Sequence, residues 1–236
     1  MTRSAEADRG FLAGWKGAFL FALLGALVGT GAVMLFGGQL VRGYILDNPE
    51  ILPEAMERLQ QRKAASAIDA NREALETPFA GAWAGAEDGD VVLVEFFDYA
   101  CGYCRKSNAD VDRLLAEDKK LKVVWREWPV LGPDSEAAAQ LSLAAAKAGK
   151  FVPFYKQMFA AGRPSAETLQ AARQALVLSG PLPPPEAAPE LQKNFQLAQA
   201  LEGDGTPLFV VGDTILHGAV GYQALKEAIA EARERS

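Results

Sequence analysis

The sequence predicts an α/β domain built on a mixed β-sheet and carried behind an apolar N-terminal segment. Residues 91–99 form an apolar run, followed by an amphipathic stretch and a second apolar run at 121–128; this alternation is typical of a parallel β–α–β unit. Two short apolar runs near the C-terminus, 208–211 and 214–217, indicate an antiparallel hairpin. The segment 17–36 carries no charged residue.

The segment 17–36 predicts a transmembrane helix, because about 20 apolar residues are needed to cross the hydrocarbon core of a bilayer. Basic residues precede it and only Arg42 follows it closely, so the positive-inside rule places residues 1–16 in the cytoplasm and the remainder outside. For a bacterium this predicts a single-pass inner-membrane protein whose C-terminal domain lies in the periplasm. The alternative is a cleaved signal peptide, which would leave a soluble periplasmic domain.

Residues 37–76 are expected to form a linker and a helical stalk. The stretch 48–76 is rich in helix-forming residues and carries a short apolar stripe at Leu52, Met56 and Leu59. A helix this polar buries little surface by itself. Two interpretations remain open for it: a solvated spacer, or a stalk through which copies of the chain form a homo-oligomer.

The main domain is expected over residues 77–236. A Gly/Ala-rich segment at 77–90 marks its boundary, and the strand at 91–99 opens its sheet. Residues 134–202 are expected to be mainly helical, in pieces separated by glycines and a proline-rich loop, and to form an insertion before the hairpin. A final amphipathic helix is expected at 222–233.

The composition excludes several classes of function. The formal net charge of -6 argues against a nucleic-acid partner, because such partners usually require a basic face. Cys101 and Cys104 are the two cysteines of the sequence, and its single histidine, His217, is distant from them. A zinc site needs about four ligands, so we expect no metal and no cofactor. The pair is interpreted as a redox dithiol, which export supports, because thiols outside the cytosol are not held reduced; structural thiols or a fixed disulfide are the alternative.

The position of the two cysteines suits disulfide exchange. Cys101 falls between a buried strand and a helix, and Cys104 lies one turn further along. A helix N-terminus carries unpaired N–H groups and a partial positive charge, which favour the thiolate, the nucleophilic form. We therefore expect Cys101 to attack a disulfide and Cys104 to release the resulting mixed disulfide.

Two further features are expected near the dithiol. Glu95 lies in the apolar run, where burial would raise its pKa and let it exchange protons with Cys104. An ion pair with a nearby Lys or Arg is the alternative for this acid. Thr206 and Pro207 precede a strand, and a proline there leaves a neighbouring backbone edge open. A cis peptide bond and an ordinary trans proline are both compatible with that position.

These residues together resemble a known family. The run Glu95-Phe96-Phe97-Asp98-Tyr99-Ala100-Cys101-Gly102-Tyr103-Cys104, with the later Gly205-Thr206-Pro207, resembles the DsbA-like disulfide oxidoreductases. Those are bacterial periplasmic proteins in which a helical domain interrupts a thioredoxin fold. The resemblance covers roughly residues 77–235 and implies that fold here, with the insertion at about 134–202.

The resemblance also implies roles for individual residues. Cys101 would be the nucleophile, Cys104 the resolving thiol and Glu95 the buried acid. Pro207 would be a cis-proline facing the dithiol. The substrate site would be lined by Thr206, Gly102 and Tyr103.

The two residues between the cysteines refine this expectation. Gly-Tyr stands where the strong oxidants of the family have Pro-His, so one source of thiolate stabilisation is absent and a moderate reduction potential is expected. With its helical segment at 48–76, the chain looks like the subgroup that includes the suppressor-of-copper-sensitivity proteins, some of which oligomerise through that segment and act as isomerases.

The expected function is a membrane-tethered periplasmic thiol–disulfide oxidoreductase or isomerase. Its partners would be exported proteins with thiols or disulfides and a membrane redox partner; a copper(I)-binding or chaperone module is the alternative.

Overall fold

The computed structural model describes residues 25–26, 38–39 and 41–235. The chain divides into two compact units, residues 1–59 and 60–236. The expected transmembrane segment, 17–36, lies outside the described residues except for Gly25 and Ala26. Within the described ranges, none of the helices combines the length and the apolar character that a membrane crossing requires.

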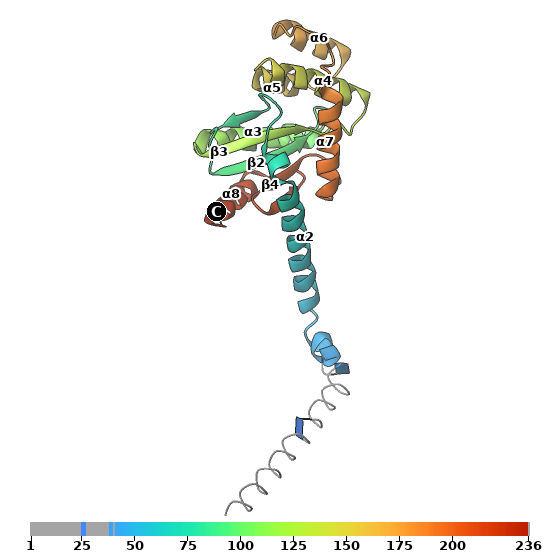
Figure 1. Ribbon diagram of the computed structural model, residues 1–236, viewed down its shortest axis with the longest axis vertical. Helices are drawn as coiled ribbons and strands as arrows, with labels where there is room; N and C mark the ends of the chain where they lie inside the picture. The colour runs from blue at the N-terminus through green and yellow to red at the C-terminus, as the bar shows by residue number, and fades with distance from the viewer. Residues whose placement is uncertain (1–24, 27–37, 40, 236) are drawn as a thin grey trace, which may run out of the picture. The chain divides into compact units, whose positions relative to one another are not determined.

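A five-stranded sheet forms the centre of the second unit, in the order β1-β3-β2-β4-β5 (Figure 1). Strands β2 and β3 are parallel, and the other neighbouring pairs are antiparallel. The sheet is therefore mixed, as the sequence predicts. The strands span Trp83–Gly85 (β1), Val91–Phe97 (β2), Leu121–Glu127 (β3), Leu208–Val211 (β4) and Thr214–His217 (β5).

The helices follow the expected order along the chain. α3 connects the two parallel strands, and α4 to α7 form the predicted insertion between β3 and β4. Figure 1 shows α4, α5 and α6 grouped together at one end of the domain. The helices span Ile51–Glu76 (α2), Gly102–Glu117 (α3), Pro133–Lys147 (α4), Phe151–Ala161 (α5), Ala166–Ala175 (α6), Ala187–Ala200 (α7) and Tyr222–Arg235 (α8).

Alternating residues of the central strand divide the core into two layers. Leu93 and Phe97 face a cluster that contains buried residues of α3, α4, α5 and α8. Val94 and Phe96 face a second cluster, which contains buried residues of α7 and of the C-terminal half of α2. This period of two is the direct consequence of the pleat of a strand covered on both faces.

The segment 77–90, expected to be a domain boundary, also contains a β-strand. Residues Trp83–Gly85 form a short strand that pairs antiparallel with β3 and extends the sheet by one strand. A strand of three residues, rich in small side chains, leaves no alternation for a sequence pattern to reveal. The edge of β3 supplies the hydrogen-bonding partner that makes it a strand.

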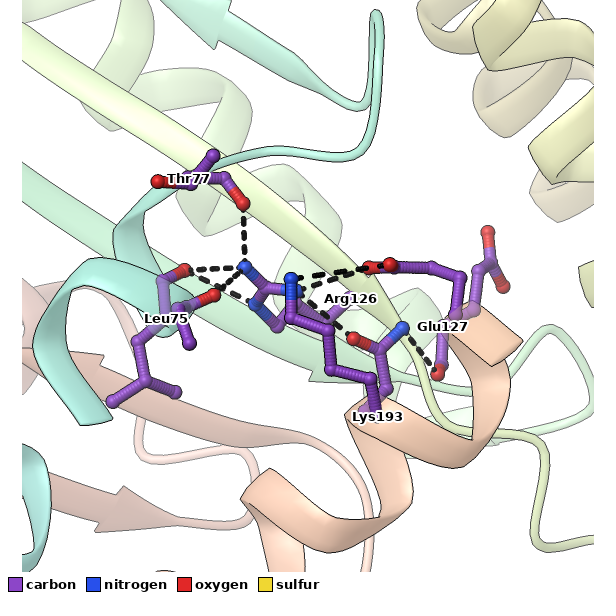
Figure 2. Close-up of polar contacts among 8 residues, drawn as sticks. Leu75, Thr77, Arg126, Glu127 and Lys193 are labelled. Atoms are coloured by element: carbon purple, nitrogen blue, oxygen red, sulfur yellow. Dashed lines mark hydrogen bonds and ion pairs between the residues drawn. The ribbon is translucent and has the colours of Figure 1, made fainter. Parts of the chain in front are cut away.

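A buried arginine, Arg126, joins α2 to α7 (Figure 2). Its guanidinium donates to the carbonyl oxygens of Ala74, Leu75 and Thr77, at 3.0 Å from Leu75 and 2.6 Å from Thr77. The last carbonyls of a helix lack partners inside the helix, and a cation is favourable at that end. On its other side Arg126 contacts two side chains of α7, Glu190 at 3.2 Å and Asn194 at 2.9 Å.

Candidate active site

The dithiol lies at the junction of β2 and α3. Cys101 is the N-cap of α3, with φ −77° and ψ 118°, and its Sγ accepts the backbone N–H of Cys104 at 3.3 Å. An N-cap residue accepts from the free N–H groups of the first turn. Both cysteines are thiols here, and the Cys104 side chain is buried. The sulfur of Cys101 therefore stands at the positive end of the helix, as expected.

The two thiols differ strongly in acidity. A hydrogen bond from the Cys104 side chain is the main cause that lowers the pKa of Cys101, to about 6. Burial acts against this shift, whereas a hydrogen bond with Thr206 and backbone N–H groups add to it. Burial raises the pKa of Cys104, and its hydrogen bond to Cys101 and the charge of Glu95 act in the same direction. At neutral pH, Cys101 is a thiolate and Cys104 holds its proton.

Strand pairing brings Thr206 and Pro207 to the dithiol. β4 runs antiparallel to β2, with Phe96 opposite Leu208, so the start of β4 lies beside the end of β2. The Thr206–Pro207 peptide bond is cis. The Cys101 Sγ lies 3.3 Å from the carbonyl oxygen of Thr206, to which it donates a hydrogen bond when it is protonated. Thr206 thus contacts Cys101 across 105 residues of chain, and Pro207 follows it through a cis peptide bond.

The Glu95 carboxyl is fully buried and interacts electrostatically with both cysteines. Its Oε2 accepts a hydrogen bond from the Trp125 Nε1 at 2.9 Å and lies 3.4 Å from the Tyr155 hydroxyl. Among the residues that the structure describes, none provides a hydrogen-bonding partner for its Oε1. Burial raises the pKa of Glu95 to about 8, against the opposing effect of these two donors. Its partners are neutral donors, so the alternative of an ion pair with Lys or Arg does not apply.

The surface around Cys101 is partly apolar. Gly102 is exposed, and the side chain of Tyr103 is 68% exposed at the start of α3. The loop after β3 contributes two more exposed apolar side chains, Val130 and Leu131. Such a rim suits contact with an unfolded or extended polypeptide.

Asp98 connects this loop to the dithiol, and the sequence analysis did not single it out. The carboxylate is buried and accepts the backbone N–H of Ala100 at 2.7 Å and those of Val130 and Leu131 at 2.9 Å each. It also accepts the hydroxyl of Ser135 at 2.7 Å. Its position directly after the strand, within the resemblance motif, was the available signal.

Two family profiles match the chain. The DSBA-like thioredoxin domain matches residues 92–230, which include the dithiol, the helical insertion and Pro207. The N-terminal domain of the copper resistance protein ScsC matches residues 38–66. The two matches follow one another along the chain without overlap.

Solved structures show the same architecture. A Proteus mirabilis ScsC variant with a deleted linker is 28% identical and superposes with a TM-score of 0.72, covering 84% of this chain and 93% of that one. A thioredoxin-like oxidoreductase from Silicibacter pomeroyi is 35% identical, with a TM-score of 0.66 over 70% of this chain and 99% of that one.

A curated relative matches this chain over a part of its own length. The Na(+)/H(+) antiporter NhaA 3 of Salinispora tropica is 28% identical over 156 residues, which are 63% of this chain and 24% of the antiporter. The chain thus spans about a quarter of the length of that relative. The domain-wide profile match, together with the dithiol geometry, establishes that the chain belongs to the DSBA-like thioredoxin domain family.

Proposed function

We propose that this chain catalyses thiol–disulfide exchange on exported proteins, with Cys101 as the attacking sulfur and Cys104 as the resolving sulfur. The observation that carries the proposal is the placement of Cys101 as the N-cap of α3, with its Sγ 3.3 Å from the Cys104 backbone N–H and Cys104 buried behind it, and the opposite pKa shifts of the two thiols agree with it. A thiolate attacks disulfides, whereas a buried thiol with a high pKa is held back until a mixed disulfide has formed.

The exchange balances in both directions. In reduction, the Cys101 thiolate attacks a substrate disulfide, forms a mixed disulfide and releases one substrate sulfur as a thiolate. In the molecules in which Glu95 is ionised, a minor fraction at neutral pH, Cys104 then loses its proton to this carboxylate and attacks the Cys101 sulfur. This step forms the Cys101–Cys104 bond and releases the second substrate thiolate. Oxidation of a substrate is the reverse sequence, in which Glu95 returns the proton to Cys104. Thr206, Pro207 and the exposed residues around them would hold the substrate chain.

The proposed setting is the periplasmic side of a bacterial inner membrane. The apolar segment 17–36 and the basic residues before it support a single membrane anchor. Release after signal cleavage is the alternative arrangement. A membrane redox partner would then set the net direction of exchange, because one dithiol serves oxidation, reduction and isomerisation.

The helical segment at 48–76 is proposed to form a homo-oligomer. Leu52, Met56 and Leu59 are each about half exposed, at 53%, 57% and 47%. The match to the ScsC N-terminal domain over residues 38–66 includes this stripe. Sedimentation of the whole chain in detergent tests it: Leu52→Glu with Met56→Glu should give a monomer with unchanged thermal unfolding, and a wild-type monomer would contradict the proposal.

The function is tested by insulin reduction and by refolding of scrambled ribonuclease with the whole chain in detergent. Wild type should be active, and Cys101→Ser should lose the activity. The matched variant Cys104→Ser should retain the first attack and accumulate mixed disulfide. Equal turnover by wild type and Cys101→Ser would refute the proposal, and tight stoichiometric copper(I) binding without turnover would favour the metal-binding alternative.

A further inference from the structure

We propose that Tyr155 is a positioning residue for the dithiol reaction, whose hydroxyl turns between Glu95 and Asn108 as Glu95 loses and gains its proton. The Tyr155 hydroxyl lies 2.6 Å from the Asn108 Oδ1 and 3.4 Å from the Glu95 Oε2. The proposal rests on the proposed role of Glu95. It assigns to the helical insertion, through α5, a part in the proton transfer of the resolving step.

The ring of Tyr155 is held in place, so the hydroxyl hydrogen is the part that can move. The side chain is 4% exposed. Its ring lies 5.0 Å from Trp125, 5.1 Å from Phe97 and 4.8 Å from Phe159, measured between centroids. Rotation of a hydroxyl hydrogen needs no movement of these packed rings.

The Tyr155 hydroxyl has fewer hydrogens than nearby acceptors, so it can donate to only one of them at a time. Tyr155 has one hydrogen, and both the Asn108 Oδ1 and an ionised Glu95 are acceptors. When Glu95 carries its proton, the hydrogen of Tyr155 goes to Asn108, the nearer partner. When Glu95 is ionised, the charged carboxylate is the stronger acceptor and takes that hydrogen. The Trp125 N–H stays on the Glu95 Oε2 in both states.

The arrangement couples the switch to the resolving thiol. Asn108 follows Cys104 by four residues in α3, so the two side chains lie on the same side of that helix, one turn apart. When Cys104 transfers its proton to the Glu95 carboxylate, the thiolate forms and the Tyr155 hydrogen is released to Asn108. The thiolate then attacks Cys101, the new disulfide bond forms and the substrate sulfur leaves with the electron pair.

The groups that interact with the Glu95 carboxyl can be named one by one, so the effect of each on its titration can be tested. Tyr155 reaches it from α5, and Trp125 contributes a neutral donor from β3. Within the described part of the chain, the other titratable groups whose interactions reach Glu95 include Cys101 at the N-cap of α3, Cys104 and Asp112 on α3, and Tyr99 after β2. Formation of the Cys101–Cys104 disulfide removes the two thiols from this set.

The test measures the carboxyl pKa of Glu95 by infrared difference titration of the oxidised whole chain, with Glu95→Gln identifying the band. Tyr155→Phe removes a donor to the ionised form and should raise this pKa by about one unit, a tenfold change in the ionisation constant. Asn108→Leu removes the competing acceptor and should lower it by a similar amount. Shifts of the same sign, or no shift in either variant, would overturn the proposal.

Tyr99→Phe is the matched control. Tyr99 is a buried tyrosine in the same aromatic cluster, but its hydroxyl contacts Ser142 at 2.7 Å and Glu127 at 3.4 Å instead of Glu95. Tyr99 interacts with Glu95 without a hydrogen bond between them that would be lost, so its replacement should shift the pKa of Glu95 much less than Tyr155→Phe does. A shift as large as that of Tyr155→Phe would show that general repacking, and not the Tyr155 hydroxyl, sets the pKa.

A kinetic readout separates this proposal from the one on which it rests. With a small thiol loaded on Cys101 as a mixed disulfide, the pH midpoint of its release should move up in Tyr155→Phe, and the plateau rate at high pH should be retained. A release profile that Glu95→Gln leaves unchanged would refute the role of Glu95 itself. If Glu95→Gln alters the release profile but Tyr155→Phe leaves its pH midpoint unchanged, only the role of Tyr155 is refuted.

Discussion

The low pKa of Cys101 has a main source that can be removed without changing Cys101. The largest contribution is the hydrogen bond from the Cys104 side chain, and Cys104→Ala deletes it while the backbone N–H of residue 104 remains. With a pKa of about 6, Cys101 is about 90% thiolate at pH 7. A hydrogen bond to a charged group is worth about 1.5–3 kcal/mol, which is roughly one to two pKa units. In Cys104→Ala the thiolate fraction at pH 7 should therefore fall to about 10–50%.

The assay is the pH dependence of alkylation by iodoacetamide, followed by mass spectrometry. Because the pKa of Cys101 is lowered and that of Cys104 is raised, Cys104 keeps its proton and the wild-type rate reports on Cys101. The rate at pH 7 should drop about two- to tenfold in Cys104→Ala, in line with the thiolate fraction. Cys104→Ser retains an O–H donor and should keep the midpoint near that of wild type. The reasoning is refuted if Cys104→Ala keeps the wild-type midpoint, or if both variants shift equally.

Two further predictions concern stability. Glu95 has a folded pKa of about 8 against an ordinary value of 4.5, so the folded state binds the extra proton and the free energy of unfolding should fall as pH rises between these values, by up to about 5 kcal/mol. Urea titrations at several pH values should show a steeper decline in wild type than in Glu95→Gln, in which the buried Glu127, whose pKa is also raised by burial, still contributes. Arg126→Met should lower the free energy of unfolding by about 3–5 kcal/mol, because it leaves carbonyls of α2 without their donor and removes the shorter ion pair of the nearly buried Glu190, which retains Lys193 at 3.9 Å. The exposed ion pair between Arg58 and Glu54 is the control. Arg58→Met should lower the free energy of unfolding by less than about 1 kcal/mol in the same titration.

The parts of the site that the sequence predicts are those whose evidence is local. Cys101 and Cys104 follow a strand that is apolar enough to be recognised as buried, and a helix N-terminus is implied by what comes after them. Glu95 stands out because an acid is unusual in such a run. Its raised pKa follows from burial alone, so the direction of the shift was predictable without coordinates.

The remaining parts depend on contacts between segments distant in sequence. Tyr155 is 60 residues from Glu95, and Asn194 is 68 residues from Arg126. No spacing rule connects such pairs, because the geometry of the sheet and the insertion decides which helix covers which strand. The membrane-spanning segment at 17–36 stays a prediction from hydropathy.

The same distinction holds for the stalk. Its helix was predictable from composition, but its burial was not uniform along its length. Ile68 and Leu75 pack into the core with residues of β2 and α7, whereas Leu52 and Met56 remain exposed. A polar helix pattern contains too few apolar residues to show which half of it packs on a neighbouring sheet.

The central claim is that Cys101 attacks a substrate disulfide and Cys104 resolves the product. Incubation of Cys104→Ser with an oxidised peptide, followed by peptide mapping, tests this most directly. The account predicts a stable mixed disulfide between Cys101 and the peptide, and the same adduct in wild type only transiently. Absence of the adduct from Cys104→Ser, or an equally stable adduct in wild type, would contradict it.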